Sequence, residues 1–402
     1  MTNEMSNVPE LRFPEFDGEW EEKTIGKIAT TFSGGTPTST NRSYYNGEIP
    51  FIRSGEISKS STELMINKEA ISNSSAKMVE KGDLLYALYG ATSGEVAISK
   101  INGAINQAVL CIRSQESATY IFNYLKMKKD QILKTYIQGG QGNLSASIIK
   151  KVDINLPYIE EQQKIGGFFS KLDRQIELEE QKLEKLEEQK KGYMQQIFSH
   201  QLIFKDKNGA IYPEWKTLKI KDIAEILRGL TYKPKDIRVA GIRVLRSSNI
   251  IKDKFHTYKD DIFVDESVVK TPLVNKGDIL ITAANGSPKL VGKHAIIEKL
   301  DDESVAGGFM YILRSDNSKF IQIWMSTVEY KRIISRVQGG NGSIGNLSRK
   351  DLENGYITLP CDEEQNKIGS FFNKFDELIE KQNKKIDGLK ERKKGFLQKM
   401  FV

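Results

Sequence analysis

The sequence predicts an α+β protein of two tandem, pseudo-symmetric globular domains, separated by two long helices that form an antiparallel coiled coil. A duplication is the first observation that predicts this fold. Residues 156–198 align without a gap on residues 359–401, at an offset of 203, with 22 identities in 43 positions. The second observation is that each matched segment follows a stretch of about 140 residues with short β-branched and aromatic runs. The 402 residues therefore contain two copies of one arrangement, a domain followed by a helix.

Weaker matches upstream indicate where each domain begins. Glu19-Trp20 matches Glu214-Trp215, and Lys81-Gly82-Asp83 matches Lys276-Gly277-Asp278, both at an offset of 195. The expected divisions are a tail at 1–18, a first domain at 19–157, a long helix at 158–199, a linker at 200–213, a second domain at 214–360 and a second long helix at 361–402.

The matched segments predict long helices, because they contain no proline after Pro157 or Pro360 and are rich in Glu, Lys, Gln and Leu. Two ladders of side chains recur every seven residues, which is typical of a coiled coil. The alternative is two solvated helices, each packed on its own domain. The residues predicted to pair the helices are Ile176, Glu179, Leu183, Leu186, Lys190, Ile379, Gln382, Ile386, Leu389 and Lys393.

Polar residues that interrupt the ladders predict a register for the antiparallel pair, in which facing residue numbers add to a constant. A sum of 572 places Glu179 opposite Lys393 and Lys190 opposite Gln382, so that every polar ladder position meets a polar partner. The same sum places Leu183 opposite Leu389. Other registers would bury a charge against an apolar layer, which is costly where the seam is dry.

Within the globular segments, short apolar runs alternate with turn clusters, as strands do. Strands are expected near 83–89, 95–98, 278–282 and 355–359, and one helix in each half at 120–136 and 319–337. Both domains are therefore predicted to be mixed α+β.

Composition excludes several classes of protein. The chain has 60 Lys and Arg against 53 Asp and Glu, which leaves +7 and permits a polyanionic partner. Cys111 and Cys361 lie too far apart in sequence for a disulfide framework or a cysteine-based zinc site, and three scattered histidines support no metal site. No run approaches 18 apolar residues, so no membrane span is expected. We expect a protein of the reducing cytoplasm.

Motifs for catalysis are missing from the sequence. The chain has no Pro-Asp start of a common nuclease motif, no Asn-Pro-Pro-Tyr or Asp-Pro-Pro-Tyr of adenine methyltransferases, and no Gly-x-x-x-x-Gly-Lys-Ser/Thr. We therefore expect no catalytic residue, no metal and no cofactor in this chain.

Glycine-rich polar loops beside aromatic and basic residues are the remaining candidates for function. Glycine lets a backbone approach phosphate closely, and the polar side chains can meet base edges. An ordinary surface turn is an equally good explanation of any single loop. Features shared by both halves should be framework or phosphate contacts, whereas differing positions should specify sequence. The candidate DNA-binding residues are Thr36, Tyr44, Asn46, Tyr89, Thr92, Ser93, Gln138, Gln141, Asn143, Arg228, Tyr232, Lys233, Arg246, Asn249, Asn285, Ser287, Lys289, Gln338 and Asn341.

Four duplicated features carry a resemblance to a known family: Leu-Pro-x-x-Glu-Glu-Gln-x-Lys-Ile-Gly, the following Phe-Phe-x-Lys-x-Asp, the Lys-Lys-Gly before each helix end and the opening Glu-Trp. Through them the chain resembles the specificity subunits of type I restriction-modification systems, over essentially its full length. The resemblance implies two target-recognition domains held apart by two antiparallel helices, each domain reading half of a split double-stranded DNA site. It implies docking of two modification (methyltransferase) subunits and, for cleavage, of two restriction subunits. S-adenosylmethionine, ATP and Mg²⁺ would belong to those partners.

Three other classes stay open on the residues alone. They are a free-standing DNA-binding or scaffolding protein, a nuclease or methyltransferase with an unrecognised site, and a coiled-coil assembly protein without affinity for DNA.

Overall fold

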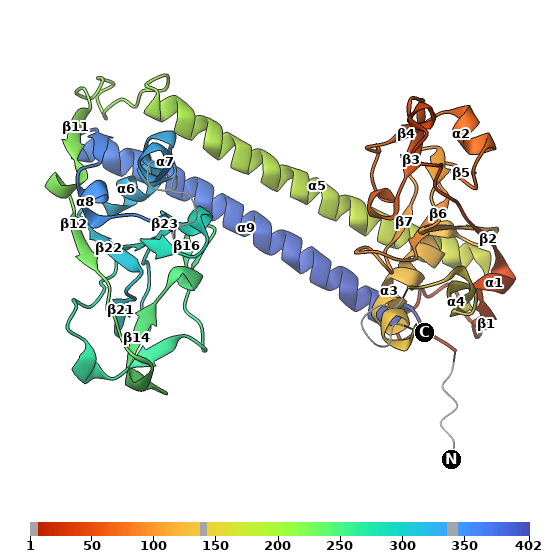
Figure 1. The fold of residues 1–402 in the computed structure, drawn as a ribbon. Coiled ribbons are helices and arrows are strands. Elements are labelled where there is room, and N and C mark those ends of the chain that lie inside the picture. Colours follow the sequence, from red (N-terminus) through yellow and green to blue (C-terminus); the bar gives the residue numbers. More distant parts are fainter. Residues whose placement is uncertain (1–6, 137–142, 336–344) are drawn as a thin grey trace, which may run out of the picture. The chain divides into compact units, whose positions relative to one another are not determined.

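The structure of the chain is a computed structural model, and it describes residues 7–136, 143–335 and 345–402. The chain divides into two compact units. The first unit comprises Met1–Lys182 and Gln382–Val402, and the second comprises Leu183–Lys381. Each unit contains one globular domain and parts of both long helices, α5 (Ile159–Phe198) and α9 (Asp362–Met400) (Figure 1). The candidates Gln138, Gln141, Gln338 and Asn341 lie outside the described residues.

Two four-stranded sheets make up most of the first domain, in the orders β2-β9-β6-β7 and β4-β3-β8-β5, and β1 pairs with β10. Helix α3 covers the first sheet, where Tyr120 and Leu125 are fully buried. The elements are β1 (Glu21–Thr24), α1 (Ile25–Ile28), β2 (Ala29–Ser33), β3 (Ile49–Ile52), β4 (Met65–Ile66), α2 (Lys68–Ser72), β5 (Lys77–Val79), β6 (Leu84–Ala87), β7 (Val96–Ile98), β8 (Gly103–Ile105), β9 (Val109–Ser114), α3 (Ala118–Tyr136), α4 (Ala146–Lys150) and β10 (Asp153–Leu156).

The second domain repeats this topology. Its sheet β12-β22-β18-β20 corresponds to β2-β9-β6-β7, and its parallel pair β14-β21 corresponds to β3-β8. The elements are β11 (Lys216–Lys219), β12 (Glu225–Arg228), β13 (Ile237–Arg238), β14 (Ile242–Leu245), β15 (Ile250–Ile251), β16 (Lys254–Phe255), β17 (Ile262–Val264), β18 (Ile279–Thr282), β19 (Ala284–Asn285), β20 (His294–Ile296), β21 (Ser304–Ala306), β22 (Met310–Arg314), α6 (Ser318–Met325), α7 (Val328–Ser335), β23 (Gly345–Asn346), α8 (Arg349–Glu353) and β24 (Tyr356–Leu359).

One helix prediction is wrong in the second domain. The sequence predicts a single helix at 319–337, but the structure has α6 and α7, separated at Ser326 and Thr327. The Thr327 hydroxyl donates to the carbonyl of Trp324 at 2.6 Å. Such a local bond gives the backbone an alternative to continuing the helix. The break lets buried Trp324 and Tyr330, one from each helix, pack edge to face.

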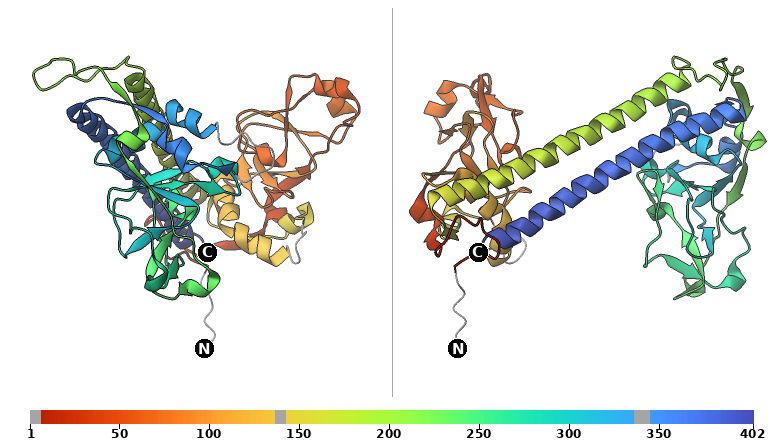
Figure 2. Two further views of the ribbon diagram at one scale, coloured as in Figure 1. Left: turned by 60° about the vertical axis from the view of Figure 1, so that its left-hand side comes forward. Right: turned by 180° about the vertical axis from the view of Figure 1, so that it is seen from behind.

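Helices α5 and α9 are antiparallel partners within each unit (Figure 2). In the first unit Leu172, Ile176 and Leu389 form one apolar cluster, with Phe396 packed against it. In the second unit Tyr193 packs edge to face on Phe371 and at a tilt on Phe375, at centroid distances of 5.4 and 5.6 Å. The prediction of an antiparallel coiled coil is confirmed, and every predicted pairing residue is buried or half-buried.

The predicted register, however, is wrong by about one heptad. Glu179 accepts from Gln382 at 2.7 Å and pairs with Lys385 at 2.6 Å, and it does not face Lys393. Lys393 instead bonds both oxygens of Asp173, and the numbers 173 and 393 add to 566 rather than 572. Leu389 packs on Leu172 and Ile176 rather than on its predicted partner, Leu183.

An aspartate outside the ladder explains why this register is stable. Lys190 in the second unit pairs with Asp376 at 2.7 Å, and Lys393 in the first unit pairs with Asp173. The offset of 203 relates Lys190 to Lys393 and Asp173 to Asp376, so each unit contains the same ion pair. An aspartate beside the ladder therefore neutralises each ladder lysine, and no polar ladder residue is needed opposite that lysine.

Candidate nucleic-acid interface

Four loops of the first domain meet at one edge of the sheet β2-β9-β6-β7. Strands β2 and β6 both run antiparallel to β9, with Ser33 opposite Leu110 and Ala87 opposite Val109, so the loops that follow them leave from the same edge. The backbone N–H of Leu144 donates to the carbonyl of Leu88 at 3.0 Å and brings in a further loop. A Cβ placed on Gly90 would lie 3.8 Å from Ser54 Oγ, so the turn at 54–56 lies here too. We call this edge the loop edge of the first domain, and it comprises residues 33–36, 54–56, 89–94 and 143–144.

The second domain has an equivalent loop edge on the sheet β12-β22-β18-β20. Arg228 lies opposite Tyr311, and Thr282 lies opposite Met310, which again places two strand ends together. The Thr282 hydroxyl donates to Ser247 Oγ at 3.0 Å. This loop edge comprises residues 228–233, 246–249, 285–289 and 345–347. Folding thus gathers loops that are more than 100 residues apart in the sequence.

The shared Lys-Gly-Asp lies at the opposite end of each sheet and is part of the framework. Arg314 Nε and Nη2 donate to the two oxygens of Asp278 at 2.9 and 2.7 Å, and Arg113 bonds Asp83 in the same way at 2.8 and 2.6 Å. Burial raises the pKa of Asp83, but the Arg113 bonds and a backbone N–H outweigh it, and the net pKa is lowered. The repeated motif is therefore an ion-paired part of the framework, at the end of each sheet away from the loop edge.

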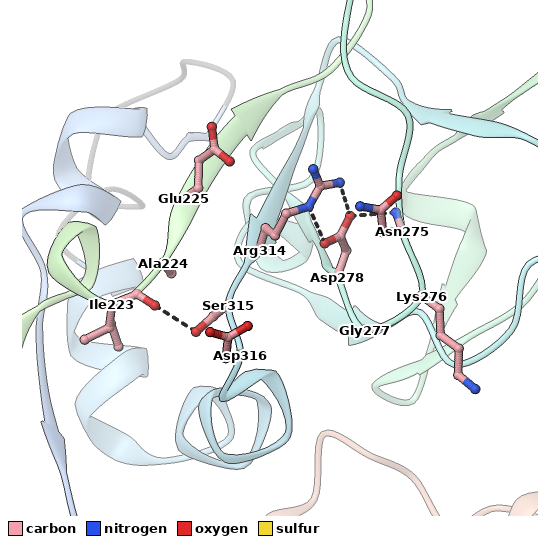
Figure 3. A pocket seen from close by; sticks show the side chains of 10 residues that line it. All are labelled: Ile223, Ala224, Glu225, Asn275, Lys276, Gly277, Asp278, Arg314, Ser315 and Asp316. Atoms are coloured by element: carbon pink, nitrogen blue, oxygen red, sulfur yellow. Dashed lines mark hydrogen bonds and ion pairs between the residues drawn. The ribbon is translucent and has the colours of Figure 1, made fainter. Parts of the chain in front are cut away.

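A cavity of about 480 Å³ lies beside this framework pair in the second domain. Figure 3 shows Arg314 bonded to Asp278 at its wall, with the Lys276 side chain pointing away from them. Glu225 and Asp316 add exposed carboxylates to the lining. Because the framework arginine is already neutralised, this cavity is a poor site for a polyanion. Its lining residues are Ile223, Ala224, Glu225, Asn275, Lys276, Gly277, Asp278, Arg314, Ser315 and Asp316.

Most predicted residues of the first domain lie at the loop edge or next to it. Thr36, Asn46 and Asn143 are exposed, and Tyr44, Tyr89, Thr92 and Ser93 are half-buried. Three of these side chains form hydrogen bonds within the domain, and the Thr36 hydroxyl donates to Gln107 Oε1 at 2.6 Å. The Ser93 hydroxyl donates to the carbonyl of Leu88 at 3.0 Å, and the Tyr44 hydroxyl accepts from Asn73 at 3.1 Å. Tyr44 and Asn46 lie on a separate 3-10 turn that packs on the other sheet.

In the second domain the exposed predicted residues are Arg228, Lys233, Arg246, Ser287 and Lys289, and Tyr232 and Asn285 are half-buried. All of these belong to the loop edge.

The prediction that Asn249 contacts DNA is corrected. Its side chain is fully buried: Oδ1 accepts from the backbone N–H of Arg246 at 2.8 Å, and Nδ2 donates to His256 and Asp261. With its polar atoms already used, Asn249 supports the turn and cannot meet a base edge.

Sequence reasoning missed Phe309, which is 72% exposed. Its carbonyl accepts from the backbone N–H groups of Ala283 and Ala284 at 2.8 and 3.1 Å, so the residue lies next to the loop edge, beside the strand end of β18. In the first domain, Ala108 makes the equivalent bond to Leu88, and Ala108 is buried. The preceding Gly307-Gly308 is the only sequence signal that marks a turn here. Exposure distinguishes Phe309 from an ordinary core aromatic.

The described residues offer neither a metal-binding cluster nor a helix that could span a membrane. Those residues contain no group of three or more His, Cys, Asp and Glu side chains that could hold a metal ion. None of their helices is long and apolar enough to cross a membrane.

Known proteins resemble both halves of the chain. The family model described as the type I restriction modification DNA specificity domain matches residues 17–188 and 212–391. The type I restriction enzyme MjaVIII specificity subunit of Methanocaldococcus jannaschii is 25% identical, over 98% of this chain and 93% of that protein. The MjaIX specificity subunit of the same organism is 24% identical, over 95% and 92%.

A solved structure has the same fold. The S subunit of a type I restriction-modification system from M. genitalium superposes with a TM-score of 0.62 at 15% identity, covering 98% of this chain and 99% of that one. The two matches of the family model together span most of the sequence, and each contains one domain with its loop edge. The chain therefore belongs to the specificity subunits of type I restriction-modification systems.

Proposed function

We propose that this chain reads a split double-stranded DNA target, one half-site with each domain, and docks modification (methyltransferase) subunits that act on it. The observation that carries the proposal is the pair of loop edges. Two domains of one topology each gather four loops at the same place, and these loops differ in sequence between the domains. A repeated framework with unlike loops suits a reader of two different half-sites.

The side chains at the loop edges fit this role. The second domain offers exposed Arg228, Lys233, Arg246 and Lys289, which can contact phosphates or base edges. The first domain offers mainly neutral donors and acceptors, such as Thr36, Asn46 and Asn143. We therefore expect binding by the second domain to depend more steeply on salt than binding by the first.

Chemistry on the DNA would come from partner subunits. S-adenosylmethionine would bind to two modification subunits, and ATP and Mg²⁺ to two restriction subunits that join for cleavage. The absence of recognisable catalytic motifs from the sequence supports this division. Incubation of the purified chain alone with DNA, S-adenosylmethionine, ATP and Mg²⁺ should give neither methylation nor cleavage.

Exchange of one domain tests the bipartite reading. Replacing residues 19–157 by the first domain of a different specificity subunit, in a strain that carries the modification subunits, should change one half-site and leave the other intact. Mapping methylated bases across the genome measures this. Exchange of residues 214–360 is the matched control and should change the other half-site. An exchange of either domain that alters both half-sites would contradict the proposal.

Phe309→Ala should weaken binding of the cognate target by about 1–3 kcal/mol, as expected for an aromatic side chain that contacts or stacks on bases. Because the side chain is 72% exposed, the variant should keep the stability of the second domain. Titration of labelled duplexes by the complex measures binding, and thermal unfolding measures stability. Unchanged affinity would show that Phe309 does not touch DNA.

A further inference from the structure

The two domains carry an arginine at equivalent places with different surroundings. Arg53 and Arg246 each precede a 3-10 turn, Ser54–Glu56 and Ser247–Asn249. In both turns the side chain three residues after the arginine accepts from the arginine backbone N–H, at 3.3 Å for Glu56 and 2.8 Å for Asn249. Both accepting residues are buried. The backbone arrangement is therefore shared, and the two domains differ in the acceptor.

In the first domain the guanidinium is neutralised. Arg53 Nε donates to Glu56 Oε2 at 3.0 Å, and Nη2 donates to Glu63 Oε2 at 2.5 Å. These two side-chain bonds raise the pKa of Arg53, although burial opposes them. An arginine held by two carboxylates has little left to offer a polyanion, so Arg53 stabilises its turn.

In the second domain an amide replaces the carboxylate. Asn249 carries no charge, and its Nδ2 donates inward to the carbonyl of His256 at 3.0 Å and to Asp261 at 2.9 Å. Arg246 is exposed, and within residues 7–136, 143–335 and 345–402 no carboxylate pairs with its guanidinium. Asp261 and Asp302 pair instead with Arg243, which lies on β14, the strand that ends just before Arg246.

The turn that carries Arg246 is anchored to the loop edge. Ser247 Oγ accepts from the Thr282 hydroxyl at 3.0 Å, and the Ser247 carbonyl accepts from Lys293 Nζ at 3.2 Å. A carbon of the Arg246 side chain lies 3.7 Å from where a Cβ on Gly307 would be. An unpaired guanidinium on an anchored turn loses less freedom on binding than one on a flexible loop.

We propose that Arg246 reads a guanine of the second half-site in the major groove, and that its counterpart Arg53 is a framework residue that reads no base. The planar fork of arginine matches the O6 and N7 acceptors of guanine, the commonest specific contact between proteins and DNA. Asn249 stands where the first domain has Glu56, so this position provides no carboxylate to pair with the Arg246 guanidinium, which can therefore bind a base. The inference rests on the proposed function, because it takes recognition of a split DNA target as given.

The test uses the full chain with its co-purified modification subunits and duplexes of the target mapped by methylation in the host. Each guanine of the second half-site is replaced in turn by 7-deazaguanine, which lacks the N7 acceptor. The unmodified protein should lose affinity at one guanine in particular. Arg246→Ala should bind the unmodified duplex about 5- to 160-fold more weakly, accept other bases at that one position, and be insensitive to 7-deazaguanine there.

Arg53→Ala is the matched control. It should lower the stability of the first domain while leaving base preference unchanged in both half-sites, since it removes a framework ion pair. Equal weakening of Arg246→Ala on cognate and random DNA would overturn the inference and make Arg246 a phosphate contact. A second half-site without guanine on either strand would also overturn it. Failure of the proposed function is a distinct result, in which the unmodified complex methylates or binds no split target at all.

Discussion

Phe401→Ala should lower the free energy of unfolding of the first unit by about 3–5 kcal/mol, the usual cost of truncating a buried phenylalanine. Phe401 is only 5% exposed, and its ring packs on Tyr120, Tyr124 and Phe169 at centroid distances of 5.1, 6.0 and 5.8 Å. The residue completes the core of a domain that begins almost 400 positions earlier.

Hydrogen exchange in the intact chain can measure this effect and locate it. Phe401→Ala should reduce protection of α3, which carries Tyr120 and Tyr124. The repeat supplies a matched control, because Phe198 stands at the equivalent position and packs on Trp215 and Phe320 in the second unit. Phe198→Ala should reduce protection of α6 and spare α3. Full protection of α3 in the Phe401 variant would show that the contact adds little to the stability of the first domain.

Asp173→Ala should cost the first unit about 2–3 kcal/mol, because it leaves Lys393 buried without its counter-ion. The side chain of Lys393 is 9% exposed and that of Asp173 is 41% exposed, so solvent screening holds the loss below that of a fully buried pair. Asp376→Ala removes the equivalent pair of the second unit. Since Lys190 is 27% exposed, we expect a loss of about 1 kcal/mol or less there.

The loss caused by Asp173→Ala should shrink as the pH rises toward 10.5. Burial lowers the pKa of Lys393 in the folded chain, although Asp173 raises it, so removal of Asp173 should lower this pKa further. Above the folded pKa and below the ordinary value of 10.5, the unfolded chain binds more protons than the folded one, so stability rises with pH in both proteins. The rise begins at a lower pH in the variant, and its deficit therefore shrinks between the two folded pKa values of Lys393. Denaturant unfolding at pH 7 and pH 10 measures the difference. A deficit that grows with pH would contradict this explanation.

Adding Lys393→Met to Asp173→Ala provides the check on mechanism. The double variant should recover most of the lost stability, because an apolar side chain of similar length replaces the unpaired charge. If the double variant is as unstable as Asp173→Ala alone, packing rather than charge is responsible for the loss.

Much of the architecture was predictable from the sequence because it depends on patterns local to the chain. The gapless repeat at an offset of 203 predicted two domains and two helices, and the seven-residue ladders predicted which side chains line the seam. Ile176, Gln382 and Leu389 are indeed buried there. Positions on one helix face follow from helix geometry alone, so no partner is needed to infer them.

The tertiary structure alone decided the register of the helices, the break between α6 and α7, and the burial of individual loop residues. A ladder that repeats every seven residues looks nearly the same after a slip of one heptad. The register is determined instead by the ion pairs of Asp173 and Asp376, which lie outside the ladders. Asn249 and Phe309 show the same limit, since a polar residue became buried and an aromatic one exposed. Burial and ion pairing depend on atoms contributed by distant segments, and a local pattern contains no information about those atoms.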